Sequence, residues 1–261
     1  MSNSSEPTAN YCFCTLALRE KYQKLTKTLA EDLKKYAPGG SLVVGTDAPQ
    51  YFDNSPNVIA FKHTQKGILH CYNDKRFVLE KSLKLFPTAI FVDADTRLIE
   101  SLSDNLDFTP GIVGYHQSMV EHNKKYRPRD LPNLIRVSEK LGIPSEQVNW
   151  IGESLFIVTR DGGKEQEFLH FWGKIALYLE MKGMHSGEGS IMGLAAAKVG
   201  WTIDTSEAWL ILKNKSNHLD ASYQPPIKKD FWQPLQKRLG YHYRLNLARL
   251  NALKNYDFYY R

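Results

Sequence analysis

The segment Ala89-Ile90-Phe91-Val92-Asp93-Ala94-Asp95 places an acidic pair directly after four apolar residues. The apolar run predicts a buried strand, and the two aspartates follow at its carboxyl end. Because side chains at positions i and i+2 of a strand share a face, we expect Asp93 and Asp95 to point outward together. Two carboxylates provide half of a divalent-cation site, and ligands of open α/β sheets bind at this edge. The alternative interpretation is a polar loop that only ends the strand.

The residues before this segment alternate between strand-like and helix-like patterns. Strands are predicted at residues 11–18, 41–45 and 58–61, and helices at residues 22–36 and 74–86. Together with the strand that leads to Asp93, they give the order β-α-β-β-α-β. This order predicts an α/β fold in which residues 11–95 form a Rossmann-like, nucleotide-binding half.

The residues after the acidic pair are less regular. Strands are predicted at residues 111–115 and 154–159, and a short helix at residues 134–141. The basic, proline-containing region 121–149 around that helix predicts a surface loop or lid. A later helix carries Phe168, Phe171, Trp172, Ile175 and Leu179 on one face, which is typical of a core-facing helix.

Two glutamates are candidates for chemistry in this second half. Glu188 lies between Gly187 and Gly189, and glycines let the backbone approach a ligand closely. The same residue is also explained by ordinary capping, since a carboxylate is favoured in the first turn of a helix. Glu153, which follows Gly152, is a weaker candidate with the same ambiguity.

The composition indicates an ordinary globular chain. It has 261 residues, of which 42% are hydrophobic, enough for a sizeable core. The longest apolar runs are far shorter than the ~20 residues of a membrane span, and the first ten residues lack a signal pattern. We therefore expect a cytoplasmic protein. The three cysteines, Cys12, Cys14 and Cys71, show no zinc-site spacing and are expected to be small buried residues.

The net charge of +6 favours anionic partners, and the basic excess is concentrated in residues 228–261. Aromatic residues interleave with these cations, a combination that suits peripheral contact with the inner surface of a membrane. The alternative is a helix at residues 243–253 that packs Leu245, Leu247, Ala248 and Leu250 onto the domain. We expect a flexible N-terminus at residues 1–10, one domain at residues 11–220 and a basic aromatic C-terminal extension at residues 221–261.

Several segments in this order resemble a known family, the retaining glycosyltransferases of the GT-A fold, most nearly the ABO blood-group-like enzymes. Residues 15–22 (Thr-Leu-Ala-Leu-Arg-Glu-Lys-Tyr) resemble its segment that grips uracil and ribose, and residues 43–47 (Val-Val-Gly-Thr-Asp) resemble the strand that follows. Asp93-Ala94-Asp95 resembles its D-x-D metal motif. The resemblance extends from about Tyr11 to His218, with one departure: Gly187 stands where the family has an acid before the glutamate.

The resemblance implies a mixed sheet and a complete site, divided into a nucleotide-binding half at residues 11–95 and an acceptor half at residues 96–220. The residues implied to bind the nucleotide sugar are Thr15, Leu16, Ala17, Tyr22, Asp47, Arg76, Asp93, Ala94 and Asp95. The implied metal ligands are Asp93, Asp95 and His218, and the implied acceptor contacts are His116 and His185. The carboxylate implied to face the sugar is Glu188 or Glu153. For Lys75 a solvated helix position is expected.

The implied reaction is metal-dependent sugar transfer from a nucleotide diphosphate donor, with a UDP-sugar favoured, to a glycan or lipid-linked acceptor. Mn²⁺ or Mg²⁺ would neutralise the diphosphate, and retention of configuration is implied by the family. Two alternatives remain open. One is a nucleotidyltransferase or nucleotide-sugar phosphohydrolase, although no G-x-x-x-x-G-K loop is present. The other is a non-catalytic nucleotide- or anion-binding module. Nucleic acid is a disfavoured partner.

Overall fold

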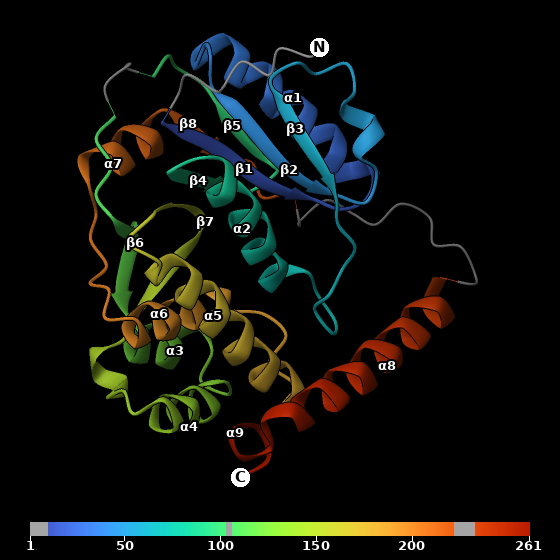
Figure 1. The fold of residues 1–261 in the computed structure, drawn as a ribbon, viewed down its shortest axis with the longest axis vertical. Coiled ribbons are helices and arrows are strands. Elements are labelled where there is room, and N and C mark those ends of the chain that lie inside the picture. Colours follow the sequence, from blue (N-terminus) through green and yellow to red (C-terminus); the bar gives the residue numbers. More distant parts are fainter. Residues whose placement is uncertain (1–9, 103–105, 222–232) are drawn as a thin grey trace.

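The computed structural model describes residues 10–102, 106–221 and 233–261, and is built around a mixed six-stranded sheet (Figure 1). The strand order is β3-β2-β1-β4-β7-β6; β1, β2, β3 and β4 are parallel, and β7 is antiparallel to both β4 and β6. The strands are β1 (Tyr11–Ala17), β2 (Ser41–Thr46), β3 (Val58–Lys62), β4 (Thr88–Val92), β6 (Gly111–Ser118) and β7 (Asn149–Thr159). The predicted α/β class and mixed sheet are therefore confirmed.

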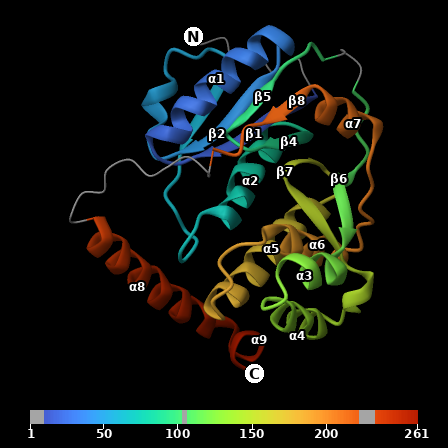
Figure 2. The same ribbon diagram turned by 180° about the vertical axis from the view of Figure 1, so that it is seen from behind.

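Helices cover both faces of this sheet (Figures 1 and 2). One face packs against α1 (Glu20–Tyr36) and α7 (Glu207–Asn214), and the other against α2 (Lys75–Leu85), α5 (Lys164–Met181) and α6 (Glu188–Lys198). The remaining helices are α3 (Met119–Tyr126), α4 (Leu131–Leu141), α8 (Gln233–Ala252) and α9 (Tyr256–Tyr260), with short 3₁₀ turns at Pro49–Phe52, Tyr72–Asp74, Ser145–Gln147 and Leu253–Asn255.

The central strand β4 shows why the opening segment folds as it does. All five of its residues are buried between β1 and β7, and a strand covered on both faces needs a continuous apolar run. Its odd and even side chains enter different cores: Phe91 packs with α2 and α5, and Ile90 and Val92 pack with α1. The strand ends at Val92, so Asp93 and Asp95 lie in the turn that follows rather than on the strand.

A second, two-stranded sheet joins distant parts of the chain. Strand β5 (Thr96–Leu98) follows the acidic turn and pairs antiparallel with β8 (Ser216–His218), with Thr96 opposite His218. Arg97 reinforces this sheet by a two-pronged ion pair with Asp32 of α1, at 2.5 and 2.9 Å. The pairing places His218 beside the end of β4.

Several predicted elements have different bounds in the structure. Strand β7 begins at Asn149 rather than at residue 154, and Pro132 lies in the first turn of α4, where a missing amide hydrogen costs nothing, rather than in a lid. Cys12 and Cys14 are buried, whereas Cys71 is partly exposed. The predicted flexible N-terminus, residues 1–10, lies outside the described residues except for Asn10.

The C-terminal helix α8 also differs from its prediction. It spans Gln233–Ala252 rather than residues 243–253, and of the four residues expected to pack, Ala248 is buried whereas Leu247 and Leu250 are exposed. In the described ranges, no helix has the length and apolar content needed to cross a bilayer.

A candidate metal and nucleotide-sugar site

A cavity of about 740 Å³ opens at the carboxyl ends of β1 and β4, the edge at which ligands of α/β sheets bind. Its volume lies in the range typical of small-molecule sites. Both halves of the chain contribute to its lining, which includes Leu16, Arg19, Tyr22, His70, Cys71, Tyr72, Lys75, Asp93, Ala94, Asp95, His122, Tyr126, Arg127, Trp150, Glu153, Glu188 and His218.

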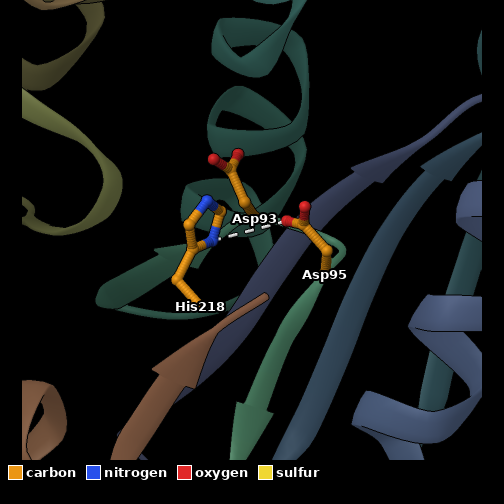
Figure 3. Close-up of side chains that lie close together, drawn as sticks. All are labelled: Asp93, Asp95 and His218. Carbon is orange, nitrogen blue, oxygen red and sulfur yellow. Dashed lines mark ion pairs between the residues drawn. The ribbon is translucent and has the colours of Figure 1, made fainter. Parts of the chain in front are cut away.

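Asp93, Asp95 and His218 form one group in this cavity, here called the acidic cluster (Figure 3). One ligand atom from each lies within 4.8 Å of the others, and Asp95 Oδ1 is 3.4 Å from His218 Nδ1. Backbone contacts fix the turn, because Thr96 donates its N–H to the Asp93 carbonyl at 2.9 Å. The N–H of Ala221, beyond β8, donates to Asp95 Oδ2 at 2.7 Å and orients that carboxylate.

The ligand atoms of the acidic cluster are chemically suited to a divalent cation. Carboxylate oxygens suit Mg²⁺ and Mn²⁺, and a neutral imidazole nitrogen adds a ligand that suits Mn²⁺. Asp95 is almost completely buried, whereas Asp93 and His218 retain about 27% and 33% exposure toward the cavity. A cation at this position would therefore contact the protein on one side and a ligand in the cavity on the other.

Lys75 links the acidic cluster to the opposite wall of the cavity. Its ammonium group lies 2.9 Å from Asp93 Oδ1 and 3.0 Å from Glu188 Oε1, and it donates to the Glu153 carbonyl at 2.9 Å. Burial lowers the pKa of Lys75, but the charges of Asp93, Glu188 and Glu153 outweigh that effect and raise it. Lys75 is consequently a permanent cation within the site, and its predicted solvated position is wrong.

Glu188 and Glu153 share the wall around Lys75, and the three residues are here called the lysine-centred cluster. Glu188 is only 3% exposed at the first residue of α6. Glu153 Oε1 accepts the N–H of Gly189 at 2.9 Å, which ties β7 to the start of that helix. Burial, with the nearby charge of Glu188 as second cause, raises the pKa of Glu153 to about 8. At neutral pH this wall therefore holds a proton as well as a cation.

Arg76 was predicted to bind the donor, but its side chain does not line the cavity. Its guanidinium stacks on Phe77 at 3.8 Å from the ring centroid and lies against Gly173 of α5. Successive helical residues differ by about 100° in direction, so only one of two neighbouring cations can face the cavity. That residue is Lys75.

Of the other predicted nucleotide-binding residues, some line the cavity and others do not, and in β1 the alternation of side chains decides which. Leu16, Tyr22 and Ala94 line the cavity. Thr15 and Ala17 are fully buried on the opposite face of β1, since neighbouring strand residues point in opposite directions. Asp47 is also outside the cavity lining: it accepts the Arg19 N–H at 3.0 Å and the Gln23 amide at 2.7 Å, and thereby holds the loop after β1.

The two predicted acceptor histidines do not line the cavity. His116 follows an irregularity between Gly114 and His116 in the pairing of β6 with β7, which changes the direction of the strand. His185 lies beside the cavity, edge-on to Tyr241 of α8 at 6.0 Å, and its buried Nδ1 has no hydrogen-bond partner among the described residues.

An aromatic wall that the sequence analysis did not identify replaces them. His122 stacks on Trp150 with ring centroids 4.1 Å apart, and Tyr126 lies 5.0 Å from His122. Burial, followed by the charge of Arg127, lowers the pKa of His122, so its ring is neutral near pH 7. In the sequence, the signal for this aromatic wall was the set of aromatic residues next to the cations of the predicted lid, region 121–149.

Arg127 explains the glycine at position 187. Its guanidinium donates to Ser186, pairs with Asp130 at 3.3 Å and lies directly over Gly187. Gly187 has φ of 88° and precedes the first turn of α6, a conformation that favours glycine. A larger residue there would displace Arg127 from the cavity wall.

The loop between β3 and α2 forms the remaining border and is held by two buried carboxylates. Asp74 accepts the N–H groups of Lys66 at 2.7 Å and Gly67 at 3.0 Å, and Glu180 of α5 accepts the N–H of Ile68 at 2.7 Å. These hydrogen bonds hold in place the segment that brings His70, Cys71 and Tyr72 to the cavity.

Comparison with known proteins adds no constraint: no protein-family model matches this chain, and no curated protein is significantly similar to it.

Proposed function

We propose that this protein is a metal-dependent glycosyltransferase of GT-A type, which moves a sugar from a nucleotide diphosphate donor to a glycan or lipid-linked acceptor. A UDP-sugar is the favoured donor. One observation carries the proposal: the acidic cluster and the lysine-centred cluster lie in the same cavity of about 740 Å³, at the carboxyl edge of the parallel strands. Metal ligands for the diphosphate and carboxylates for the sugar are groups that suit this reaction.

The acidic cluster would hold the donor diphosphate. Asp93, Asp95 and His218 are the residues that would bind Mn²⁺ or Mg²⁺, and a bound cation would supply charge neutralisation for the departing diphosphate. Leu16 and Tyr22 line the cavity next to these ligands and would contact the base and ribose. Lys75 would add a second positive charge within reach of Asp93.

The lysine-centred cluster would act on the sugar. A carboxylate beside the anomeric carbon stabilises an oxocarbenium-like centre or attacks it, and Glu188 is the first candidate because Lys75 supplies a counter-charge at 3.0 Å. Glu153, whose pKa is raised to about 8, would retain a proton and limit repulsion between the two carboxyl groups. Retention of configuration is part of the proposal, and the stacked rings of His122 and Trp150 would form a platform for the acceptor.

The test is a thermal-shift screen of UDP-, GDP- and CMP-sugars, each with and without Mn²⁺, followed by product analysis. A ligand at about 100 times its Kd stabilises the protein by about 2.7 kcal/mol, so one nucleotide should give a clear, Mn²⁺-dependent shift. Release of nucleoside diphosphate is the expected result. Pyrophosphate from a nucleoside triphosphate would support a nucleotidyltransferase, nucleoside monophosphate would support a phosphohydrolase, and absence of any nucleotide-dependent shift would contradict all three.

A further inference from the structure

Helix α8 carries an exposed apolar stripe, defined as Leu235, Leu239, Tyr243, Leu247, Leu250 and, just after the helix, Leu253. Three of these side chains are more than three-fifths exposed: Leu239 at 62%, Tyr243 at 70% and Leu250 at 63%. Their spacing of three or four residues confines the stripe to one side of the helix, about a third of its circumference. Large apolar side chains gathered in this way mark an interaction surface.

The opposite side of α8 is the one that contacts the rest of the protein. Ala248 and Ala252 are buried, Arg244 Nε donates to the Ile68 carbonyl at 3.0 Å, and Tyr241 packs against His185. The stripe consequently faces away from the domain. In Figures 1 and 2 the helix lies along the outside of the molecule, beyond α5.

The charges on α8 indicate what kind of partner the apolar stripe binds. The helix contains Lys237, Arg238, Arg244 and Arg249 and no acidic residue, and Lys254 follows it. Two copies of this chain joined through the stripe would bring these cations together without acidic partners on either helix. A bilayer with anionic lipids instead offers hydrocarbon to the stripe and negative headgroups to the flanking cations.

We propose that α8 is an interfacial membrane helix that binds anionic bilayers, with the apolar stripe in the acyl boundary and the flanking Arg238 and Arg249 at the headgroups. A 20-residue helix is about 30 Å long, so it would lie in the interface along its whole length. This binding does not depend on the proposed reaction.

The position of α8 gives membrane binding a consequence for the cavity. Tyr241 contacts His185, which directly precedes the cavity-lining segment from Ser186 to Glu188. Arg244 contacts Ile68, in the loop that brings His70 and Tyr72 to the cavity. A bilayer beneath α8 would therefore lie close to both borders of the cavity, and, if the proposed function holds, the favoured acceptor is a lipid-linked one.

The test is flotation of the full-length protein with vesicles of phosphatidylcholine containing about 30% phosphatidylserine, compared with phosphatidylcholine alone. The native protein should bind the anionic vesicles and lose most of that binding between about 0.1 M and about 0.5 M salt. A Leu239→Ser/Leu250→Ser variant should bind at least about 10-fold more weakly, since both leucines lose apolar burial. Arg238→Gln/Arg249→Gln should lose about 10-fold on anionic vesicles.

Leu85→Ser/Leu210→Ser is the control, because both leucines are also exposed, at 41% and 46%, but lie on α2 and α7. It should bind like the native protein, and far-UV circular dichroism should show that all variants remain folded. Equal binding by native and stripe-variant protein, or no binding to anionic vesicles, would overturn the proposal. A stripe-dependent dimer in sedimentation without vesicle binding would overturn it in favour of a second copy.

Discussion

The two charged groups of the cavity differ in how their charge is compensated. In the lysine-centred cluster, Lys75 pairs with Glu188 and contacts the Glu153 carbonyl, so a cation is part of the protein itself. In the acidic cluster, Lys75 reaches Asp93 at 2.9 Å, whereas Asp95 faces His218 and the Ala221 N–H, and the ligand atoms of the three residues lie close enough together for a cation to bind between them. The lysine-centred cluster is therefore an internal network, on which folding depends, whereas the acidic cluster is arranged to bind an exchangeable cation.

The largest expected effect comes from breaking the internal network. Lys75→Met removes the cation and leaves Glu188 buried without its partner, which should lower the free energy of unfolding by about 3–5 kcal/mol at neutral pH. Denaturant unfolding measures this loss. Lys84→Met, which breaks an exposed pair with Glu80, is the control and should change stability by less than about 1 kcal/mol.

A double variant separates charge from packing in the same experiment. Lys75→Met/Glu188→Gln leaves only the partly exposed Asp93 without its cation and should regain part of the stability lost in the single variant. A double variant as unstable as the single one would show that Lys75 acts mainly through its packing on Phe91.

The next effect concerns the exchangeable site. Asp95→Asn keeps an oxygen that accepts the Ala221 N–H but removes the negative charge, so it should weaken Mn²⁺ binding at least about 100-fold with little change in fold. Isothermal titration calorimetry measures this change. Asp47→Asn is the control, because Asp47 follows β2 of the same sheet but lies outside the cavity lining, and this variant should bind Mn²⁺ normally. Normal Mn²⁺ binding by both variants would contradict the assignment of the acidic cluster.

A smaller effect tests the proton held by the internal network. The pKa of Glu153 is raised to about 8 by burial and by Glu188, so the folded protein keeps a proton that the unfolded chain releases near pH 4.5. Stability should therefore fall as pH rises from about 4.5 to about 8. The full shift corresponds to about 5 kcal/mol, and solvent screening of the partly exposed Glu153 reduces the expected loss to on the order of 2 kcal/mol. In Glu153→Gln this slope should flatten, as measured by denaturant unfolding with EDTA.

The exposed Glu139→Gln is the control for that pH series, and its slope should match that of the native protein. A native slope that persists in Glu153→Gln would mean that another group releases the proton.

The smallest expected effect concerns the start of α6, where the lysine-centred cluster meets Arg127. Gly187→Ala places a methyl group against the Arg127 guanidinium at a φ of 88° and should cost about 1–2 kcal/mol. Gly183 has the same φ with open space around it, so Gly183→Ala measures the backbone strain separately. Equal losses in the two variants would show that Arg127 moves aside without cost.

The elements predicted most accurately from the sequence depend on local patterns. Strands β1 to β4 and helices α1 and α2 follow from alternating or helical spacing of apolar residues, and the acidic pair follows from its place after a buried strand. Which of the neighbours Lys75 and Arg76 faces the cavity depends on the rotation of α2 about its own axis. Packing of Arg76 against α5 sets that rotation, and the sequence of α2 alone does not. Stacking of His122 on Trp150 joins α3 to β7, a contact that no local pattern encodes.

The pairing of β5 with β8 has a consequence for how the chain reaches its final state. Asp95 and Ala221 are 126 positions apart, and the acidic cluster exists only when the strand ending at His218 has joined the turn after β4. Contacts of such separation form late in folding because closing a long loop costs entropy. Metal affinity would therefore report that folding is complete, and a newly made chain would acquire its cation only after its last strand is in place.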